Sequence, residues 1–367
     1  MKFIDLDSQY IFLKERINKR IQKVLDHGQY ILGPEVEELE RKLEEYIGVK
    51  HVITCANGTD ALTLAMMALD VKEGDAIFCP TFTFFATAET IAHARATPIF
   101  VDSNKHTFNI CTIDLENQIK DVVSKGVLKP KAIIPVDLFG LPANYKDIIR
   151  IAHKYNLKII EDAAQGLGGS FSGKRAASFG HISTTSFFPA KPLGCYGDGG
   201  AIFTDNDDYA ELLKSLRFHG RGKDKYDNVR IGLNSRLDTI QAAVLLEKLA
   251  VFDEELEKRN AVAEFYNEIL SEYVNIPIIP DQYYSSYAQY TVRTARRADV
   301  IAKLNIAKIP YGIYYPKCLH KQEAFNRKDK FFPAAEKLSD TCLSLPMGPY
   351  IKLSNNYKDS LWKVFKR

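Results

Sequence analysis

Long hydrophobic runs are missing from this sequence. No segment approaches the roughly 18 consecutive apolar residues that a membrane-spanning helix needs. An excess of one charge is also missing, because the net charge of +3 is small and spread along the chain, which disfavours a nucleic-acid partner. The first residues, MKFIDLDSQYIFLKER, contain no apolar core followed by a cleavage site. We therefore expect a cytoplasmic protein with no membrane partner and no nucleic-acid partner.

Clustered cysteines and metal-binding motifs are absent as well. The six cysteines are scattered without a CxxC pair, and the eight histidines form neither HExxH nor HxxxH. This pattern argues against a disulfide framework or a zinc site, so we expect reduced thiols and no metal. A GxGxxG motif after the first predicted strand is also lacking, since the turn there reads NGTDAL. An NAD-dependent oxidoreductase is therefore disfavoured.

What the chain does contain is a regular alternation of strands and helices. With 367 residues, 46% of them hydrophobic, it can bury a large core. Short apolar runs predict strands at 51–55, 76–80, 98–102, 131–136, 157–161 and 201–204. Helical spacing of apolar residues predicts intervening helices at 60–69, 84–94, 113–123, 147–155 and 210–218. This alternation predicts an α/β fold, in which a mostly parallel sheet is covered by helices on both faces.

The two ends of the chain differ from this pattern. An amphipathic helix is predicted over residues 11–26 and stops at Gly28, and a second helix begins with Pro34 in its first turn. After helices at 238–251 and 254–273, only short elements follow, including strands at 287–294 and 310–315. We therefore predict a large domain over residues 1–250 and a smaller α+β domain over residues 251–367.

One lysine lies in an unusual segment, SFFPAKPLGCYGDGG, at residues 186–200. Aromatic residues and prolines surround Lys191, so its side chain is expected to be partly buried. A buried lysine is costly unless it is paired, shifted in pKa or covalently engaged. A desolvated amine is also what imine chemistry with a carbonyl requires. On this segment alone, an ordinary loop lysine is an equally good interpretation.

Other polar residues follow predicted strands, where ligands gather in parallel sheets. Asp162 ends a buried strand and Gln165 comes three residues later, while the turn Asn57-Gly58-Thr59 opens a helix. A carboxylate can keep a pyridinium nitrogen protonated, an amide can reach a ring hydroxyl, and the start of a helix can bind phosphate. Each also has an ordinary interpretation as a cap or a turn. Together with Lys191, with Ser186 as a second phosphate ligand and with Phe84 as a stacking ring, they match each functional group of pyridoxal 5′-phosphate (PLP).

Several longer motifs resemble one family over essentially the whole chain. The sequence is similar to the DegT/DnrJ/EryC1/StrS sugar aminotransferases, which are fold-type I PLP enzymes with a mostly parallel seven-stranded sheet. The motifs that carry the resemblance are GQYILGPEVEELE (28–40), CANGTDAL (55–62), FTFFATAET (82–90), IEDAAQ (160–165), SFFPAKPLGCYGDGGA (186–201), NSRLDTIQAA (234–243) and YYPKCLHKQEAF (314–325).

The resemblance implies a role for each matching residue. Lys191 would be the catalytic Schiff-base lysine and proton shuttle, Asp162 would pair with the pyridine nitrogen, Gln165 would bond the ring hydroxyl, and Phe84 would stack on the ring. The phosphate would be bound by Gly58, Thr59 and Ser186.

Two further residues would act across a homodimer with shared active sites. The resemblance implies that Asn234 reaches the phosphate of the neighbouring subunit and that Arg236 binds the carboxylate of the amino donor. Taken without the resemblance, a helix cap and a surface salt bridge are the simpler interpretations of these two residues.

The implied activity is transfer of an amino group from L-glutamate to C3 of a nucleotide-linked keto sugar, in the biosynthesis of surface glycans such as O-antigen and lipopolysaccharide. The sequence is most similar to transaminases of UDP-linked 3-keto-uronates. It departs from many relatives at Tyr314-Tyr315-Pro316, where they have His-Tyr-Pro, and at Cys318, where proline is common. Tyr314 and Tyr315 are expected beside the sugar. Because tyrosine in place of histidine at position 314 removes a potential cation beside the sugar, a neutral dTDP-linked keto sugar remains a second candidate substrate.

Three other activities compete with this one. Amination at C4 of a 4-keto-6-deoxy sugar is not excluded by the sequence. A dehydratase of the same family is disfavoured, because those members have histidine in place of Lys191. A non-catalytic cofactor-binding regulator is disfavoured too, because Asp162, Gln165 and Lys191 are all present.

Overall fold

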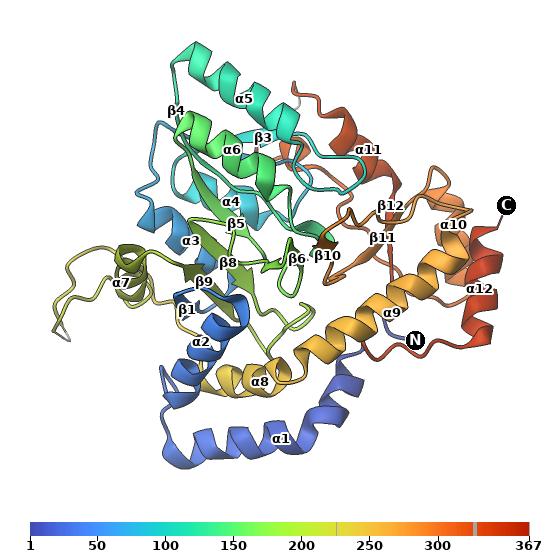
Figure 1. Cartoon of the computed structure of the whole chain (residues 1–367), viewed down its shortest axis with the longest axis horizontal. Coiled ribbons are helices and arrows are strands. Elements are labelled where there is room, and N and C mark those ends of the chain that lie inside the picture. Colours follow the sequence, from blue (N-terminus) through green and yellow to red (C-terminus); the bar gives the residue numbers. More distant parts are fainter. Residues whose placement is uncertain (225, 326–328, 367) are drawn as a thin grey trace.

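A computed structural model describes residues 1–224, 226–325 and 329–366. Its centre is a seven-stranded sheet in the order β1-β9-β8-β5-β4-β2-β3 (Figure 1). Strands β3, β2, β4, β5 and β8 are parallel to one another, whereas β9 runs antiparallel to β8 and β1. The expected seven-stranded, mostly parallel sheet is therefore confirmed. The strands are β1 His51–Cys55, β2 Asp75–Pro80, β3 Thr97–Val101, β4 Lys129–Ile133, β5 Lys158–Asp162, β8 Ile182–Ser186 and β9 Gly200–Thr204.

Helices cover both faces of this sheet, which explains its continuous apolar strands. In β2, Ile77 packs with one hydrophobic cluster and its neighbour Phe78 with another on the opposite face. The first face carries α3 Gly58–Ala68, α4 Ala86–His93 and α7 Asp207–Leu216. The second face carries α2 Pro34–Ile47, α5 Thr112–Lys125, α6 Tyr145–Tyr155 and α8 Thr239–Leu249.

The helix ends follow from local sequence. Helix α1 spans Leu6–His27 and starts earlier than predicted, because the Asp5 side chain accepts a hydrogen bond from the Ser8 N–H and caps it. It ends, as predicted, at Gly28, which has a φ of 70°. Pro34 lies in the first turn of α2, also as predicted. Helix α1 packs along α8, at the bottom of Figure 1.

The last part of the chain forms its own hydrophobic cluster. Its long helix α9 leads away from α8 toward this cluster (Figure 1). The remaining elements are α9 Phe252–Leu270, β10 Tyr283–Tyr284, β11 Tyr290–Arg293, α10 Arg297–Ile306, η2 Leu319–Lys321, α11 Pro333–Thr341, β12 Cys342–Leu345 and α12 Asn355–Phe365. The domain boundary near residue 250 stays a prediction.

Two strand assignments differ from expectation. The predicted strand at 310–315 is wrong, because Gly312 makes only an isolated bridge to Ser344. Strand β8, with the sequence ISTTS, was not foreseen from its polar residues. The smaller elements β6 Ser170–Phe171, β7 Lys174–Arg175 and η1 Leu138–Gly140 lie in the connections that follow β5 and β4.

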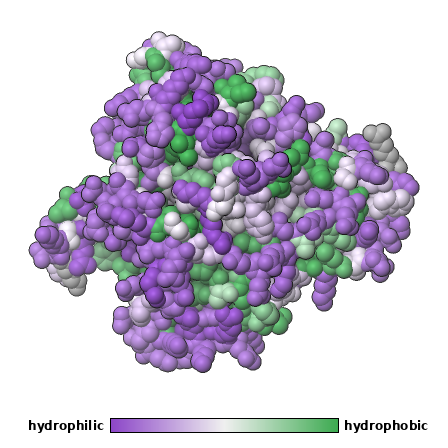
Figure 2. Space-filling view, in the orientation of Figure 1, coloured by the Kyte–Doolittle hydropathy of each residue, from purple (hydrophilic) through white to green (hydrophobic). Residues whose placement is uncertain are grey.

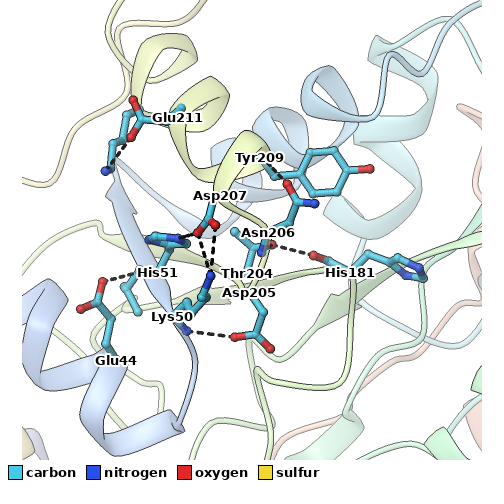
Figure 3. Close-up of polar contacts among 12 residues, drawn as sticks. Glu44, Lys50, His51, His181, Thr204, Asp205, Asn206, Asp207, Tyr209 and Glu211 are labelled. Atoms are coloured by element: carbon cyan, nitrogen blue, oxygen red, sulfur yellow. Dashed lines mark hydrogen bonds and ion pairs between the residues drawn. The ribbon is translucent and has the colours of Figure 1, made fainter.

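A cluster of polar side chains lies at the amino end of β1, opposite the edge of the sheet where β1 ends. Figure 3 shows the side chains of Lys50 and His51 pointing toward Asp207 at the start of α7. The Lys50 backbone N–H donates to Asp205 at 2.9 Å. These contacts tie α7 to the beginning of β1, so we assign the cluster a structural role.

The molecular surface in the view of Figure 2 is largely hydrophilic, with scattered hydrophobic residues. Among the helices that the structure describes, none combines the length and the apolar character needed to cross a membrane.

Candidate active site

Asp162 is the last residue of β5 and is almost fully buried, with 5% of its surface exposed. Its Oδ2 accepts a hydrogen bond from Thr87 Oγ1 at 3.0 Å, and its Oδ1 accepts one from the Ala164 N–H at 3.2 Å. Burial raises the pKa of Asp162, while these hydrogen bonds and the charge of Lys191 oppose the rise. The carboxylate is therefore held in one orientation in a site where a cationic partner would stabilise it.

Lys191 lies in the turn that follows β8. Its backbone N–H donates to the carbonyl of Phe188 at 2.9 Å, and its side chain is partly buried, as expected. Burial lowers the pKa of Lys191, and the charge of Asp162 opposes that change. The structure thus brings together a carboxylate and an amine that were predicted to work together.

The start of α3 meets the end of β8. Asn57 caps the helix, since its side chain accepts a hydrogen bond from the Asp60 N–H at 2.8 Å. A Cβ atom at Gly58 would lie 2.7 Å from the Ser186 Cβ, so only glycine allows this approach. The first N–H groups of the helix, including that of Thr59, have no partner within it. The three predicted phosphate ligands therefore lie in one cradle with a positive helix end.

Gln165 and Tyr315 form a wall of the site. The Oε1 of Gln165 accepts a hydrogen bond from the Phe139 N–H at 2.8 Å, and its Nε2 donates to the Tyr315 hydroxyl at 3.0 Å. Burial raises the pKa of Tyr315, so this hydroxyl stays protonated. The ring of Phe84 lies 6.3 Å from that of Tyr315 and is 57% exposed, which leaves one face open. Tyr314 packs beside Tyr315.

Asn234 and Arg236 flank Ser235, whose hydroxyl accepts a hydrogen bond from the N–H of Ala56, just before the α3 cradle, at 3.1 Å. Within the described residues, no hydrogen bond or ion pair joins either side chain to Asp162 or Lys191. The Arg236 guanidinium lies 4.8 Å above the Phe218 ring. A separate cavity of about 400 Å³ is lined by Ala56, Gly197, Asp198, Asn234, Arg236, Asp238 and Gln241. Within the described residues, these two side chains thus make no bond to the carboxylate and amine of the site, although their cavity adjoins the α3 cradle at Ala56.

Two residues that support the site were not predicted from the sequence. Thr87, which holds Asp162, lies in the motif FTFFATAET three residues after Phe84, so the motif contained a signal for it. His320 likewise lies in a quoted motif, YYPKCLHKQEAF, although no role was predicted for it. Its ring is fully buried, with Nδ1 2.7 Å from Thr81 Oγ1 and Nε2 3.2 Å from Glu336 Oε1. It fastens the segment that carries Tyr315 to the end of β2.

The chemistry of these groups suits PLP. A partly buried amine, a buried carboxylate with fixed orientation and a helix start approached only by glycine correspond to the aldehyde, the ring nitrogen and the phosphate of that cofactor. Among the described residues, no cluster of three or more His, Cys, Asp or Glu side chains could hold a metal ion.

Comparison with known proteins decides the family. The model of the DegT/DnrJ/EryC1/StrS aminotransferase family matches residues 12–357. The chain belongs to this family. The resemblance noted from the motifs is therefore confirmed, and the chain is an aminotransferase.

Similar proteins in this family align over almost their whole length. A UDP-2-acetamido-2-deoxy-3-oxo-D-glucuronate aminotransferase from Pseudomonas aeruginosa is 46% identical, with 96% of each chain covered. The crystal structure of a family member from Brucella abortus is 50% identical and superimposes with a TM-score of 0.96, covering 100% of this chain and 98% of the other. The structure of NtdA from Bacillus subtilis with bound cofactor PMP (pyridoxamine phosphate, the amino form of PLP) is 31% identical, with a TM-score of 0.88, covering 96% and 82%.

Proposed function

We propose that this aminotransferase moves an amino group from L-glutamate to C3 of a UDP-linked 3-keto sugar, with a 2-acetamido-3-oxo-uronate as its preferred sugar. The observation that carries the proposal is the pairing of buried Asp162 with partly buried Lys191 beside the α3 cradle, in a chain 46% identical to an aminotransferase named for such a substrate. As a member of this family the chain depends on PLP, the cofactor whose amino form NtdA binds.

PLP supplies an electron sink that allows a proton to leave the carbon bearing the amino group. In our proposal the neutral amine of Lys191 would hold and move that proton in the 1,3-shift that PLP makes possible. Asp162 keeps a proton on the ring nitrogen, and Thr87 holds Asp162 in line for this. Gln165 donates from Nε2 to the ring hydroxyl, because the Phe139 N–H already binds its Oε1.

The remaining site residues are assigned by the same reasoning. Gly58, Thr59 and Ser186 bind the phosphate at the start of α3, and Phe84 covers the ring. Tyr314 and Tyr315 face the sugar. The position of Tyr315 supports this assignment, because its hydroxyl already bonds Gln165 and its ring faces Phe84.

Asn234 and Arg236 complete the active site of a second subunit in a homodimer. The absence, among the described residues, of any bond from either side chain to Asp162 or Lys191 supports this assignment. Arg236 binds the carboxylate of the glutamate donor, since a planar guanidinium matches a carboxylate with two parallel hydrogen bonds. We further propose that the enzyme works in the cytoplasm, in the biosynthesis of a surface glycan such as O-antigen or lipopolysaccharide.

The test is a substrate panel. The PLP-loaded enzyme is incubated with glutamate and either UDP- or dTDP-linked 3-keto or 4-keto sugars, and the products are identified by mass spectrometry. We expect amination of the UDP-linked 3-keto-uronate and little product from the 4-keto sugars. Faster amination at C4, or of a neutral dTDP-linked sugar, would overturn the proposed substrate but not the aminotransferase activity.

A further inference from the structure

Two carboxylic acids lie side by side beneath the active site. Glu161 immediately precedes Asp162 in β5, and Asp137 lies between β4 and η1; both side chains are fully buried. Tyr145, whose hydroxyl donates to Asp137, stacks on Phe179 with ring centroids 4.4 Å apart, and the Phe179 N–H donates to Glu161, so the two carboxyl groups are neighbours. Two buried carboxylates in contact cannot both be ionised, because each disfavours the charge of the other. One of the two therefore carries a proton.

The donors around Glu161 identify it as the ionised partner. Its Oε1 accepts from the Ala177 N–H at 2.6 Å, and its Oε2 accepts from the N–H groups of Phe179 and Gly180 at 2.7 and 3.1 Å. The Ser183 hydroxyl donates to the same Oε2 at 2.7 Å. Hydrogen bonds from several donors stabilise the charged form of a carboxylate.

Asp137 has a different environment. Its Oδ1 accepts from the Ala143 N–H at 2.9 Å and from the Tyr145 hydroxyl at 2.7 Å, but within the described residues no donor reaches its buried Oδ2. A buried oxygen without a donor, next to a carboxylate, is where a shared proton belongs. Burial and the charge of Glu161 raise the pKa of Asp137 well above its usual range.

The pair supports the turn that orients Gln165. The Asp137 N–H donates to the carbonyl of Asp162 at 3.0 Å, and its Oδ1 holds the other end of the turn at Ala143. Between them, the Phe139 N–H donates to Gln165 Oε1. This contact leaves the Nε2 of Gln165 as the group that faces Tyr315 and the site. A Cβ atom at Gly166 would lie 2.4 Å from the Asp137 Cβ, so the packing leaves little freedom.

We propose that Asp137 is a positioning residue whose un-ionised carboxyl donates to Glu161, holds the turn at 137–143, and so turns the Gln165 amide with its NH₂ group toward the cofactor. The positioning part rests on the role proposed above for Gln165. The assignment of the shared proton to Asp137 does not depend on the role of Gln165.

The first test uses the protein without its cofactor. Infrared difference spectra at neutral pH compare the wild type with Asp137→Asn, whose carbonyl and NH₂ group reproduce the acceptor and donor of the un-ionised acid. We expect the C=O stretch of a buried carboxylic acid to disappear in Asp137→Asn while the melting temperature changes little. As a control, Asp121→Asn on the exposed face of α5 leaves the band in place. An unchanged band in Asp137→Asn would overturn the assignment of the proton.

The second test separates positioning from stability. Asp137→Leu offers neither donor nor acceptor, so we expect a melting temperature lower by several degrees, a roughly tenfold lower kcat and a shifted pH titration of the visible absorbance of the PLP-loaded enzyme. Asp137→Asn, which keeps a donor and an acceptor, should have the melting temperature, the kcat and the pH titration of the wild type. A stable Asp137→Leu with a wild-type titration and kcat would overturn the positioning role.

Two further outcomes can be told apart. If Asp137→Leu fails to fold, Asp137→Asn still tests the proposal. Loss of activity in Asp137→Asn would contradict an un-ionised Asp137, because asparagine mimics that form. If the proposed sugar is wrong, the infrared band and the cofactor titration are unaffected. Failure of this inference is therefore distinguishable from failure of the proposed function.

Discussion

The active-site floor, formed by Asp162, Gln165 and Lys191, contrasts with the arm, formed by residues 218–224 and 226–236, which contains Asn234 and Arg236. In the floor, neighbours in the same chain fix both side-chain oxygens of Asp162 and both ends of the Gln165 amide. The arm extends away from α7 (Figure 1) and exposes apolar side chains, among them Val229 and Ile231 at 53% and 87%. The side chains of the floor are held by contacts within one chain, whereas the proposed role of the arm depends on a second chain.

The largest effect should come from the floor. We expect Lys191→Ala to lower transamination roughly 10³-fold or more, because the variant loses the amine that moves the proton. The measurement is the change in absorbance when glutamate is added to the PLP-loaded protein. Lys146→Ala, an exposed lysine on α6, is the matched control and should behave as wild type. An active Lys191→Ala enzyme would show that the floor is not the catalytic centre.

A second change in the floor should separate activity from stability. Asp162→Asn is expected to lower kcat about 10²-fold, because the amide cannot hold the proton on the ring nitrogen. The pKa of Asp162 is raised in the folded protein, so ionisation costs stability as the pH rises above the ordinary value of 3.8. The variant without cofactor should therefore melt at a higher temperature than wild type at pH 7. A lower melting temperature would show that the ionised Asp162 carboxylate does not destabilise the fold.

The arm can be tested by mixing chains. Arg236→Ala should raise KM for glutamate about tenfold or more. If the arm serves the neighbouring subunit, refolding a mixture of Lys191→Ala and Arg236→Ala chains yields mixed dimers with one intact site each. Assayed at glutamate well below KM, where Arg236→Ala sites contribute little, activity should then return to about a quarter of the wild-type value. No recovery in a mixture proven to contain mixed dimers would place Arg236 in the site of its own chain.

The smallest effect concerns a lysine behind the floor. Lys248 is buried, its Nζ donates to the carbonyl of Gly194 at 2.6 Å, and burial lowers its pKa to about 8. Between about pH 8 and the ordinary value of 10.5 the unfolded chain binds more protons, so stability rises with pH in this window.

Lys248→Met should remove that rise, a difference on the order of 2 kcal/mol across the window. Urea unfolding at several pH values measures it, with Lys146→Met as control. Equal pH slopes in wild type and Lys248→Met would show that the buried amine does not titrate there.

The floor was predictable from sequence and the arm was not, for physical reasons. Asp162 ends a continuous apolar run, and Asn57 precedes a helix, so local patterns locate both. The function of Arg236 depends on a second chain, and only the family resemblance suggested it. The Asp137–Glu161 pair was not foreseen, because the two acids are far apart in sequence and meet only when β4 and β5 pair. Strand β8 was missed because its buried Ser and Thr residues do not look apolar.

The buried contacts of His320 with Thr81 and Glu336 restrict the route by which ligands reach the site. His320 and the hydrogen bond between Gln165 and Tyr315 hold the 314–320 segment against the sheet, so this wall cannot swing aside without breaking buried contacts. Phe84, whose ring lies beside that of Tyr315, and Phe188 are 57% and 52% exposed. We expect the nucleotide sugar to enter and leave past these two rings, so bulk added there should slow exchange without altering the chemistry at Lys191.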